Sequence, residues 1–251
     1  FYDKYKVRDS KKGGYGKLTP AKAFEVSSNT GIVKMVYENY KSNPKKFVDR
    51  LYNMGLSNQL GLSIKGEGEP MIPYPGDKNW SGISLPWMAF GYGVKLTPIQ
   101  ILSFYNGIAN GGEIVKPRFI YKIKNSGSSF IRKYEKEILN PSICSYPTLV
   151  KVQKMMFNVI DKKWGTANKI KSSNLKMAGK TGTCQIDYTS DEIKYVSSFV
   201  GYFPYEKPEY SCIVVINRPD KKIGYYGGEV AAPVFKEIAE KLFSRTPKDI
   251  M

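Results

Sequence analysis

Apolar residues recur at helical spacing in several stretches of the chain, and polar caps mark where these stretches begin. Thr19-Pro20 supplies an N-cap hydroxyl and a proline at the first helical position, and Ala21 and Phe24 follow at a helical interval. Thr97-Pro98 opens a similar pattern, which Asn110-Gly111-Gly112 closes. These patterns predict helices from residue 20, over 31–40, 44–54 and 98–110, from Pro147 toward Gly165, and over 229–243.

Three later runs are rich in β-branched and aromatic residues and predict strands. They contain Lys180, end at Val200–Pro204 and cover Cys212–Ile216, with a polar turn over 187–192 between the first two. Because short turns join antiparallel neighbours, we expect one antiparallel ladder. Elsewhere the pattern predicts strands or a meander over 113–140, a long irregular excursion over 55–86, and turns or a short hairpin arm over 1–17.

Helices that precede a small sheet, with a last helix to cover it, indicate an α+β fold. The 251 residues are enough for one sizeable core, so we expect a single domain over 1–251. Its helical part runs over about 18–112, and its sheet with the C-terminal helix over about 174–243. No run of about 18 apolar residues predicts a membrane span, and a chain that starts at Phe1 is compatible with an upstream leader or anchor.

The chain is strongly basic, with 39 Lys and Arg against 22 Asp and Glu and a formal charge of +17. Such a balance favours polyanions, anionic headgroups or an acidic polymer as neighbours. The lysines are scattered along the chain, and no zinc-finger, helix-turn-helix or RNP-like pattern accompanies them. We therefore expect no nucleic acid among the partners.

Histidine is absent from the chain, which removes Ser-His-Asp and Cys-His catalysis and most zinc chemistry. Any general base must be Lys, Glu, Asp or Tyr. The three cysteines, Cys144, Cys184 and Cys212, are far apart and odd in number. They indicate neither a metal site nor a disulfide framework, although one pairing among them is left open.

The stretch Ala178–Thr183 concentrates a cation, two hydroxyls and two glycines on one predicted strand. Alternation along a strand sends Lys180 and Gly182 to one side and Thr181 and Thr183 to the other. A glycine in a strand marks the close approach of a ligand or of another backbone, and the flanking ammonium and hydroxyls suit a carboxylate. The alternative interpretation is a basic turn.

A second polar stretch, Ser27-Ser28-Asn29, falls on the connection between the first two predicted helices. Taken alone, these residues are typical of helix capping.

In this order along the chain, Ser27-x-Asn29 and Lys180-Thr181-Gly182-Thr183 are two of the three elements of penicillin-recognising serine enzymes. With the further motifs, the chain resembles class B penicillin-binding proteins, above all the septal, cell-division peptidoglycan transpeptidases, from about residue 18 to 243. Those motifs are Phe90-Gly91-Tyr92-Gly93, Leu96-Thr97-Pro98-Ile99-Gln100, Val214-Val215-Ile216-Asn217, Tyr225-Tyr226-Gly227-Gly228 and Ala232-Pro233-Val234-Phe235.

The resemblance implies a penicillin-binding protein/serine β-lactamase-like fold, with an antiparallel sheet covered by helices. It also implies acyl transfer between peptidoglycan stem peptides, without a cofactor or metal, and acylation by β-lactams. Division or elongation proteins are further partners that it implies, and it places the protein on the extracytoplasmic face of the inner membrane, anchored by a segment outside this chain.

Residue roles follow from the same resemblance. Ser27 relays a proton to the leaving group, Asn29 holds the substrate backbone, and Lys180 supplies a positive field. Thr181 and Thr183 bind the substrate carboxylate beside Gly182, and the Thr183 N–H is an oxyanion donor. The resemblance further implies that Tyr225 and Tyr226 form an aromatic wall, and packing of turn aromatics on the core is the alternative.

The third element of the family, Ser-x-x-Lys, is found nowhere between Phe1 and Ser27. Matches at Ser42-Asn43-Pro44-Lys45 and Ser173-Asn174-Leu175-Lys176 follow Ser27, so we reject both as nucleophiles. We expect the chain to be the C-terminal part of a transpeptidase domain. It would then lack the first strands of the sheet, leave an unpaired sheet edge and be inactive alone.

Two other classes of function remain open at this point. One is a non-catalytic module that binds peptidoglycan or a division partner, and the other is a basic nucleic-acid-binding domain. A β-lactamase needs a deacylating base that the sequence does not place.

Overall fold

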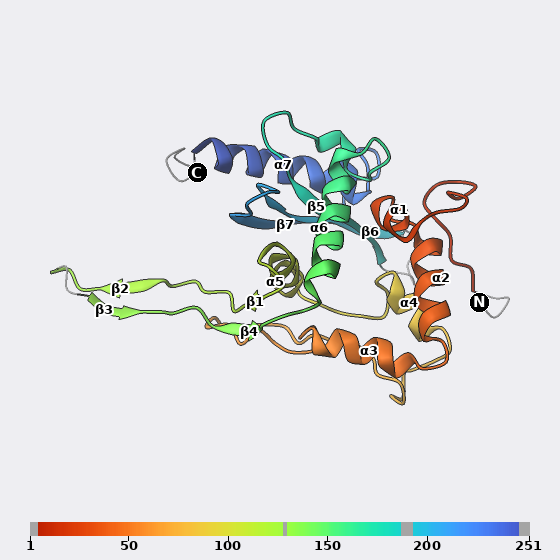
Figure 1. Cartoon of the computed structure of the whole chain (residues 1–251), viewed down its shortest axis with the longest axis horizontal. Helices are drawn as coiled ribbons and strands as arrows, with labels where there is room; N and C mark the ends of the chain where they lie inside the picture. The colour runs from red at the N-terminus through yellow and green to blue at the C-terminus, as the bar shows by residue number, and fades with distance from the viewer. Residues whose placement is uncertain (1–4, 128–129, 187–192, 246–251) are drawn as a thin grey trace.

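A three-stranded antiparallel sheet forms the centre of the computed structural model, which describes residues 5–127, 130–186 and 193–245 (Figure 1). Its strands are β5 (Ala178–Ile186), β6 (Lys194–Phe203) and β7 (Tyr210–Asn217), in that spatial order. The predicted ladder is confirmed, while the turn predicted over 187–192 lies outside the described residues. Within the described chain both β5 and β7 pair only with β6, so each has an outer edge without a strand.

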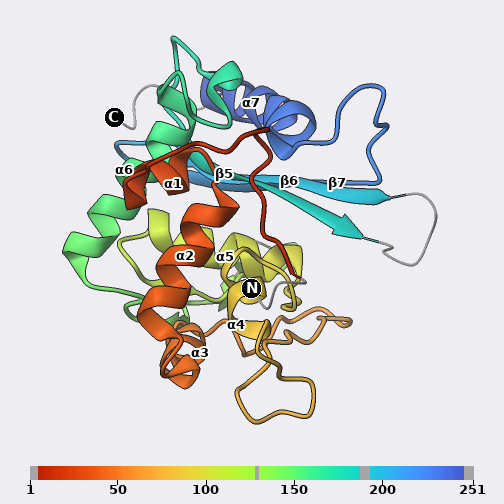
Figure 2. The same ribbon diagram turned by 90° about the vertical axis from the view of Figure 1, so that its right-hand side faces the viewer.

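Helices cover both faces of this sheet. Helix α7 (Gly227–Arg245) lies on one face, and α5 (Pro98–Ala109) and α6 (Tyr146–Asp161) lie on the other (Figure 2). The three layers and the mixture of helices with an antiparallel sheet confirm the predicted α+β class.

The alternation of side chains along β6 places apolar residues in two hydrophobic clusters, one on each face of the sheet. Phe199 and Phe203 of β6 point to α7, where their rings lie 4.8 and 5.7 Å from that of Phe235. Tyr202, one residue earlier than Phe203, packs on the opposite face in a cluster with Met156 of α6. Each face of β6 therefore has its own apolar cluster against a helix.

The helical part consists of α1 (Pro20–Glu25), α2 (Asn29–Tyr40), α3 (Pro44–Asn53) and α4 (Ser84–Ala89). The predicted cap of α1 is present, because Thr19 Oγ1 accepts a hydrogen bond from Lys22 N at 3.2 Å.

Helix α2 begins at Asn29 rather than at residue 31, because Ser28 is its N-cap and accepts a hydrogen bond from Gly31 N at 3.0 Å. Helix α4 was missing from the prediction, since a six-residue helix with an internal proline has no helical repeat to reveal it.

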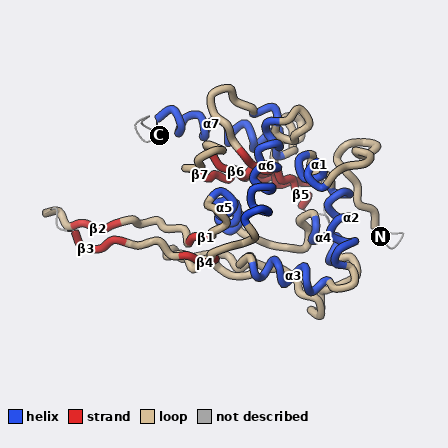
Figure 3. Tube along the Cα trace, viewed as in Figure 1, coloured by secondary structure: helices blue, strands red, loops and turns tan. Residues whose placement is uncertain are grey.

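The region predicted as a meander is one long ribbon that leaves the body of the molecule (Figure 3). Strands β1 (Ile114–Val115) and β4 (Ile138–Asn140) pair at its base, and β2 (Lys122–Lys124) and β3 (Phe130–Lys133) pair further out. A short 3₁₀ turn, η1 (Asn168–Ile170), lies between α6 and β5. No strand forms over residues 5–17, where the chain is irregular with one turn at Lys12–Gly13, so the alternative of a hairpin arm is wrong for these residues.

Candidate active site

Strand β5 divides its side chains between two sides, as the alternation predicts. Lys180 points toward α1 and the turn that follows it, where its Nζ donates a hydrogen bond to Ser27 Oγ over 2.8 Å. Thr181 and Thr183 point to the other side, where both line a cavity of about 660 Å³. The fold thus joins two stretches that are 153 residues apart.

The backbone of Ser27 is strained. Its φ of 53° lies in the left-handed region, which residues with a side chain seldom adopt. The strain is held by the turn between α1 and α2, in which Ser27 N donates to Phe24 O and Ser28 N to Ala23 O. Strained residues of this kind cluster at functional sites, and here the strained residue presents its hydroxyl to Lys180.

Burial lowers the pKa of Lys180 to about 8. Its ammonium faces the ring of Phe24 at 5.6 Å and donates to Thr181 O at 3.2 Å. No carboxylate of the described residues forms an ion pair with it, so no opposite charge there offsets the cost of desolvating the ammonium. A lysine with this pKa exchanges protons near neutral pH, and its hydrogen-bond partner is Ser27.

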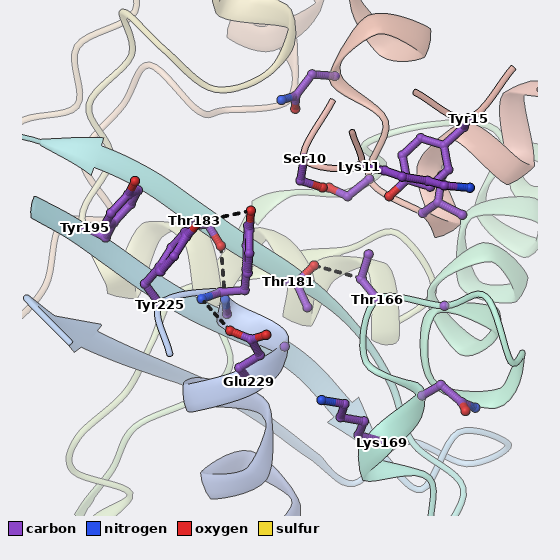
Figure 4. A pocket seen from close by; sticks show the side chains of 18 of the residues that line it. Ser10, Lys11, Tyr15, Thr166, Lys169, Thr181, Thr183, Tyr195, Tyr225 and Glu229 are labelled. Atoms are coloured by element: carbon purple, nitrogen blue, oxygen red, sulfur yellow. Dashed lines mark hydrogen bonds between the residues drawn. The ribbon is translucent and has the colours of Figure 1, made fainter. Parts of the chain in front are cut away.

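The cavity collects most of the residues that the motifs singled out, some of them labelled in Figure 4. Those on its lining are Ser27, Asn29, Thr181, Thr183, Tyr225 and Tyr226. Lys180 and Gly182 are not on the lining, because both belong to the other side of β5. Lys180 reaches the cavity only through Ser27.

The backbone of Gly182 lies against the start of α7. A Cβ on Gly227, the first residue of α7, would lie 2.4 Å from Gly182 O, so α7 starts directly against β5. Gly227 N also donates to Thr183 Oγ1 at 3.0 Å. A Cβ on Gly182 itself would lie 2.5 Å from Ser198 Oγ, a side-chain atom, so the ligand or second backbone expected beside Gly182 stays a prediction.

Asn29 lines the cavity, but its side-chain amide donates to Arg8 O at 2.9 Å. The neighbouring Asp9 accepts hydrogen bonds from Ser28 Oγ, Thr30 N and Thr30 Oγ1 at 3.1, 3.0 and 2.7 Å. A carboxylate on the first turn of α2 is favoured by the free N–H groups and the dipole of that helix. The N-terminal segment is thus tied to the Ser-x-Asn corner, which the sequence analysis missed.

Thr166 is a further residue that the motifs did not reveal. Its Oγ1 and Thr181 Oγ1 lie 2.9 Å apart in a hydrogen bond, and its N donates to Glu25 O at 3.3 Å. The Glu25 carboxylate is buried and accepts from Asn158 Nδ2 and Trp164 Nε1 at 2.7 and 2.6 Å. Thr166 lies in the segment between α6 and η1, two residues after Trp164, and no spacing rule links it to the site.

Tyrosines form one end of the cavity. Tyr195 and Tyr225 stack at 4.3 Å, and Tyr226 follows at 4.4 Å from Tyr225. The Tyr225 loop is tied to β6 through a hydrogen bond from Ser197 Oγ to Tyr225 O. Tyr225 and Tyr226 therefore pack on each other and on β6, and both also face the cavity.

No group of three or more His, Cys, Asp or Glu that could hold a metal ion occurs in the described ranges. The three cysteines, Cys144, Cys184 and Cys212, are free.

A family model named penicillin binding protein transpeptidase domain matches residues 2–240 of the chain. The chain belongs to the penicillin-binding protein transpeptidase family. The resemblance drawn from the motifs is thereby confirmed.

Named relatives of the same transpeptidase family are similar over nearly all of the chain. The peptidoglycan D,D-transpeptidase FtsI of Buchnera aphidicola is 30% identical over 230 residues, which is 90% of this chain and 37% of the relative. The penicillin-binding protein PbpB of Mycolicibacterium smegmatis is 27% identical over 95% of this chain and 37% of its own length. The chain thus spans 37% of the length of each of these two relatives.

Solved structures of penicillin-binding proteins have the same fold. Penicillin-binding protein 3 of Mycobacterium tuberculosis, complexed with aztreonam, is similar with a TM-score of 0.77 and 27% identity over 95% of this chain and 54% of that one. Penicillin-binding protein 2B of Streptococcus pneumoniae strain R6 also has a TM-score of 0.77, with 21% identity over 92% of this chain and 40% of that one. At 21% identity the second likeness shows the fold alone.

The two Ser-x-x-Lys matches of this transpeptidase-family chain are remote from the cavity. Ser42 lies between α2 and α3, and Ser173 lies in the loop before β5, where its Oγ donates to Asn174 Oδ1 at 3.2 Å. Neither residue is on the cavity lining. In the described part of the chain, no helix is both long and apolar enough to cross a membrane.

Proposed function

We propose that the chain forms the substrate-binding part of a serine-type peptidoglycan D,D-transpeptidase, which cross-links stem peptides by acyl transfer. The observation that carries this proposal is the 2.8 Å hydrogen bond from Lys180 Nζ to Ser27 Oγ beside a cavity lined by Thr181 and Thr183. This arrangement suits a ligand with a carboxylate close to a bond whose leaving group must gain a proton. A peptide that ends in D-Ala-D-Ala has both features.

The threonines bind the terminal carboxylate in this proposal. Thr183 Oγ1 accepts a hydrogen bond from Gly227 N, so its own O–H is left to donate into the cavity. Thr181 Oγ1 is held by Thr166 Oγ1, and when Thr166 donates, the Thr181 proton also points to the ligand. Two hydroxyl donors on one strand face then hold a carboxylate in a set position.

Ser27 and Lys180 handle the proton. As the nucleophile's oxygen bonds to the penultimate D-alanine carbonyl carbon, the C–N bond to the last D-alanine breaks, and its nitrogen takes a proton from Ser27 Oγ. Lys180 Nζ, already bonded to that oxygen, replaces the proton, and the proton that the nucleophile's hydroxyl loses restores the Lys180 ammonium. An amine of a second strand then attacks the ester, and the proton it loses passes through the same pair to the nucleophile's oxygen as the ester C–O bond breaks. The proposal assigns the nucleophile to no residue of this chain, because no Ser-x-x-Lys precedes Ser27.

The remaining roles in the proposal follow the family. Asn29 holds the substrate backbone at the corner, beside Gly182 on the strand, and Tyr225 and Tyr226 flank the acyl part of the substrate. The same cavity takes β-lactams, in keeping with the aztreonam and ampicillin complexes of the Mycobacterium tuberculosis relative. Residues 1–251 act as one part of a transpeptidase domain on the extracytoplasmic side of a membrane, anchored outside this chain, where division or elongation proteins are partners.

Titration of the isotope-labelled chain with diacetyl-L-Lys-D-Ala-D-Ala tests the proposal. The peptide is expected to shift the backbone amides of Thr181, Gly182 and Thr183, and the analogue with a C-terminal carboxamide is expected to bind about tenfold more weakly. Thr183→Val removes one hydroxyl donor and is expected to weaken the carboxylate peptide by a similar factor.

Thr148→Val is the matched control, because Thr148 is exposed and is not on the cavity lining. Equal binding of the acid and the amide, or shifts that avoid β5, would overturn the proposal.

A further inference from the structure

The cavity has two chemically different ends. Tyr195 and Tyr225 line one end, while Lys11 and Lys169 line the other, and Lys163, three residues before Thr166, is also on the lining. Figure 4 shows Lys11 and Lys169 on the same side as Thr166, opposite Tyr195 and Tyr225. The one acidic residue on the described lining is Glu229, and its carboxylate accepts a hydrogen bond from Tyr226 N at 3.3 Å.

The lysines that line the cavity differ from neighbouring lysines in whether they form ion pairs. Lys162 and Lys171 flank the same segment outside the cavity, and both form ion pairs with Asp161, at 3.6 and 2.6 Å. Lys163 and Lys169 line the cavity, and neither forms an ion pair with a carboxylate in the described ranges. The segment therefore pairs its outward cations with Asp161, while its inward cations have no carboxylate partner among the described residues and are open to a ligand.

The position of the lysine end of the cavity relative to β5 determines which part of a bound peptide lies beside the lysines. Thr166 lies between these lysines in the chain and bonds to Thr181. If Thr181 and Thr183 hold the terminal carboxylate, the lysines lie beyond the residue that leaves. The incoming amine takes the position of the departing one, so its strand approaches from the leaving-group side.

From this we infer that Lys163 and Lys169, with Lys11 opposite, form a subsite for a carboxylate on the amine-bearing peptide strand that accepts the acyl group. The inference rests on the proposed function, and it names the acceptor as an anionic peptide. Exposed lysines attract a carboxylate through a screened field, so the contribution to affinity is moderate and falls as salt is added.

Two synthetic peptides that differ in one group test this subsite. Acetyl-γ-D-glutamyl-L-lysinamide has a side-chain amine and one carboxylate, and its isoglutamine analogue has a carboxamide in place of that carboxylate. The acid is expected to shift the amides of residues 163–169 at low salt, and the carboxamide to bind at least fivefold more weakly.

Charge-matched variants separate the subsite from the general positive field. The double variant Lys163→Gln/Lys169→Gln is expected to weaken the acid peptide about fivefold and to leave the carboxamide unchanged. Lys65→Gln/Lys151→Gln removes the same charge at two exposed positions away from the cavity and is expected to change neither. Equal losses in the two double variants, or equal binding of the two peptides, would overturn the subsite.

Diacetyl-L-Lys-D-Ala-D-Ala distinguishes failure of the subsite from failure of the proposed function. If that peptide still shifts Thr181–Thr183 while the lysine variants leave the acid peptide unaffected, the subsite is wrong and the proposed function stands. If the acid peptide binds the lysine end but the D-Ala-D-Ala peptide does not bind β5, the assignment to an acceptor strand is overturned.

Discussion

Lys180 Nζ lies 2.8 Å from Ser27 Oγ, although 153 residues separate them in the chain. Lys180 is half-buried and has no carboxylate partner among the described residues, and the loss of solvation lowers its pKa to about 8. The protonation of Lys180 at this contact is therefore expected to affect the free energy of unfolding.

The stability of the protein is therefore expected to depend on the protonation of Lys180. Because the folded pKa is about 8 and the ordinary value 10.5, the unfolded chain binds more protons between these pH values. Stability contributed by Lys180 thus rises with pH across this window, by at most about 3 kcal/mol. Urea unfolding of the wild type and Lys180→Met at pH 7, 8, 9 and 10 measures it.

In that comparison the other lysines and the tyrosines titrate in both proteins and cancel. A stability difference between the wild type and Lys180→Met that stays constant from pH 7 to 10 would contradict the lowered pKa.

Substituting Gly227 is expected to separate α7 from β5. In Gly227→Ala the new Cβ would lie 2.3 Å from Ser198 O and 2.4 Å from Gly182 O, both backbone atoms, so the helix start must move. We expect a loss of about 1–3 kcal/mol of unfolding free energy and a weaker hydrogen bond to Thr183. Denaturant unfolding measures the first, and hydrogen exchange at the Gly227 amide the second.

Gly127→Ala is the matched control for this substitution, because a Cβ there meets no atom within 4 Å. Equal stability of the two variants would show that α7 does not rely on the glycine.

Asp9 is expected to hold the Ser-x-Asn corner in place. Asp9→Asn keeps the size of the side chain but loses the charge and one acceptor oxygen for Ser28 and Thr30. We expect about 1–3 kcal/mol lower stability and faster hydrogen exchange at the Thr30 amide. Asp220→Asn, at an exposed position, is the control. Unchanged exchange at Thr30 would mean that the N-terminal segment does not support α2.

Incubation with a fluorescent penicillin is expected to leave the chain without a covalent adduct. No Ser-x-x-Lys precedes Ser27, and neither Ser42 nor Ser173 lines the cavity. Intact-mass spectrometry reads out the result, with a penicillin-binding protein that carries the motif run in parallel to check the reagent. A stoichiometric adduct on Ser42 or Ser173 would show that the nucleophile has been misassigned.

Local signals were sufficient to predict the elements whose causes are local. The cap and proline at Thr19-Pro20 and at Thr97-Pro98 begin helices where expected, because both act within one turn. The alternation along β5 correctly separated Lys180 from Thr181 and Thr183. Helix α4 escaped notice because its six residues are held by packing of Leu85 and Met88 rather than by a periodic pattern.

Contacts between distant segments could not be read in the same way. The residues around Asp9 do not predict its hydrogen bond to Ser28, and those around Thr166 do not predict its hydrogen bond to Thr181. Only the resemblance brought Ser27 to Lys180, since no rule of spacing links residues so far apart. Gly227 shows the same limit, because the backbone atoms that a Cβ there would meet belong to Ser198 and Gly182, which are distant in the chain.

The left-handed backbone at Ser27 has a consequence for how this corner can vary. A residue with a side chain costs about 1–2 kcal/mol there relative to glycine, which adopts such a φ freely. Glycine would relieve that cost but would remove the oxygen that Lys180 bonds. The free energy of folding thus favours glycine at this position, whereas the proton transfer proposed for the site requires the serine hydroxyl.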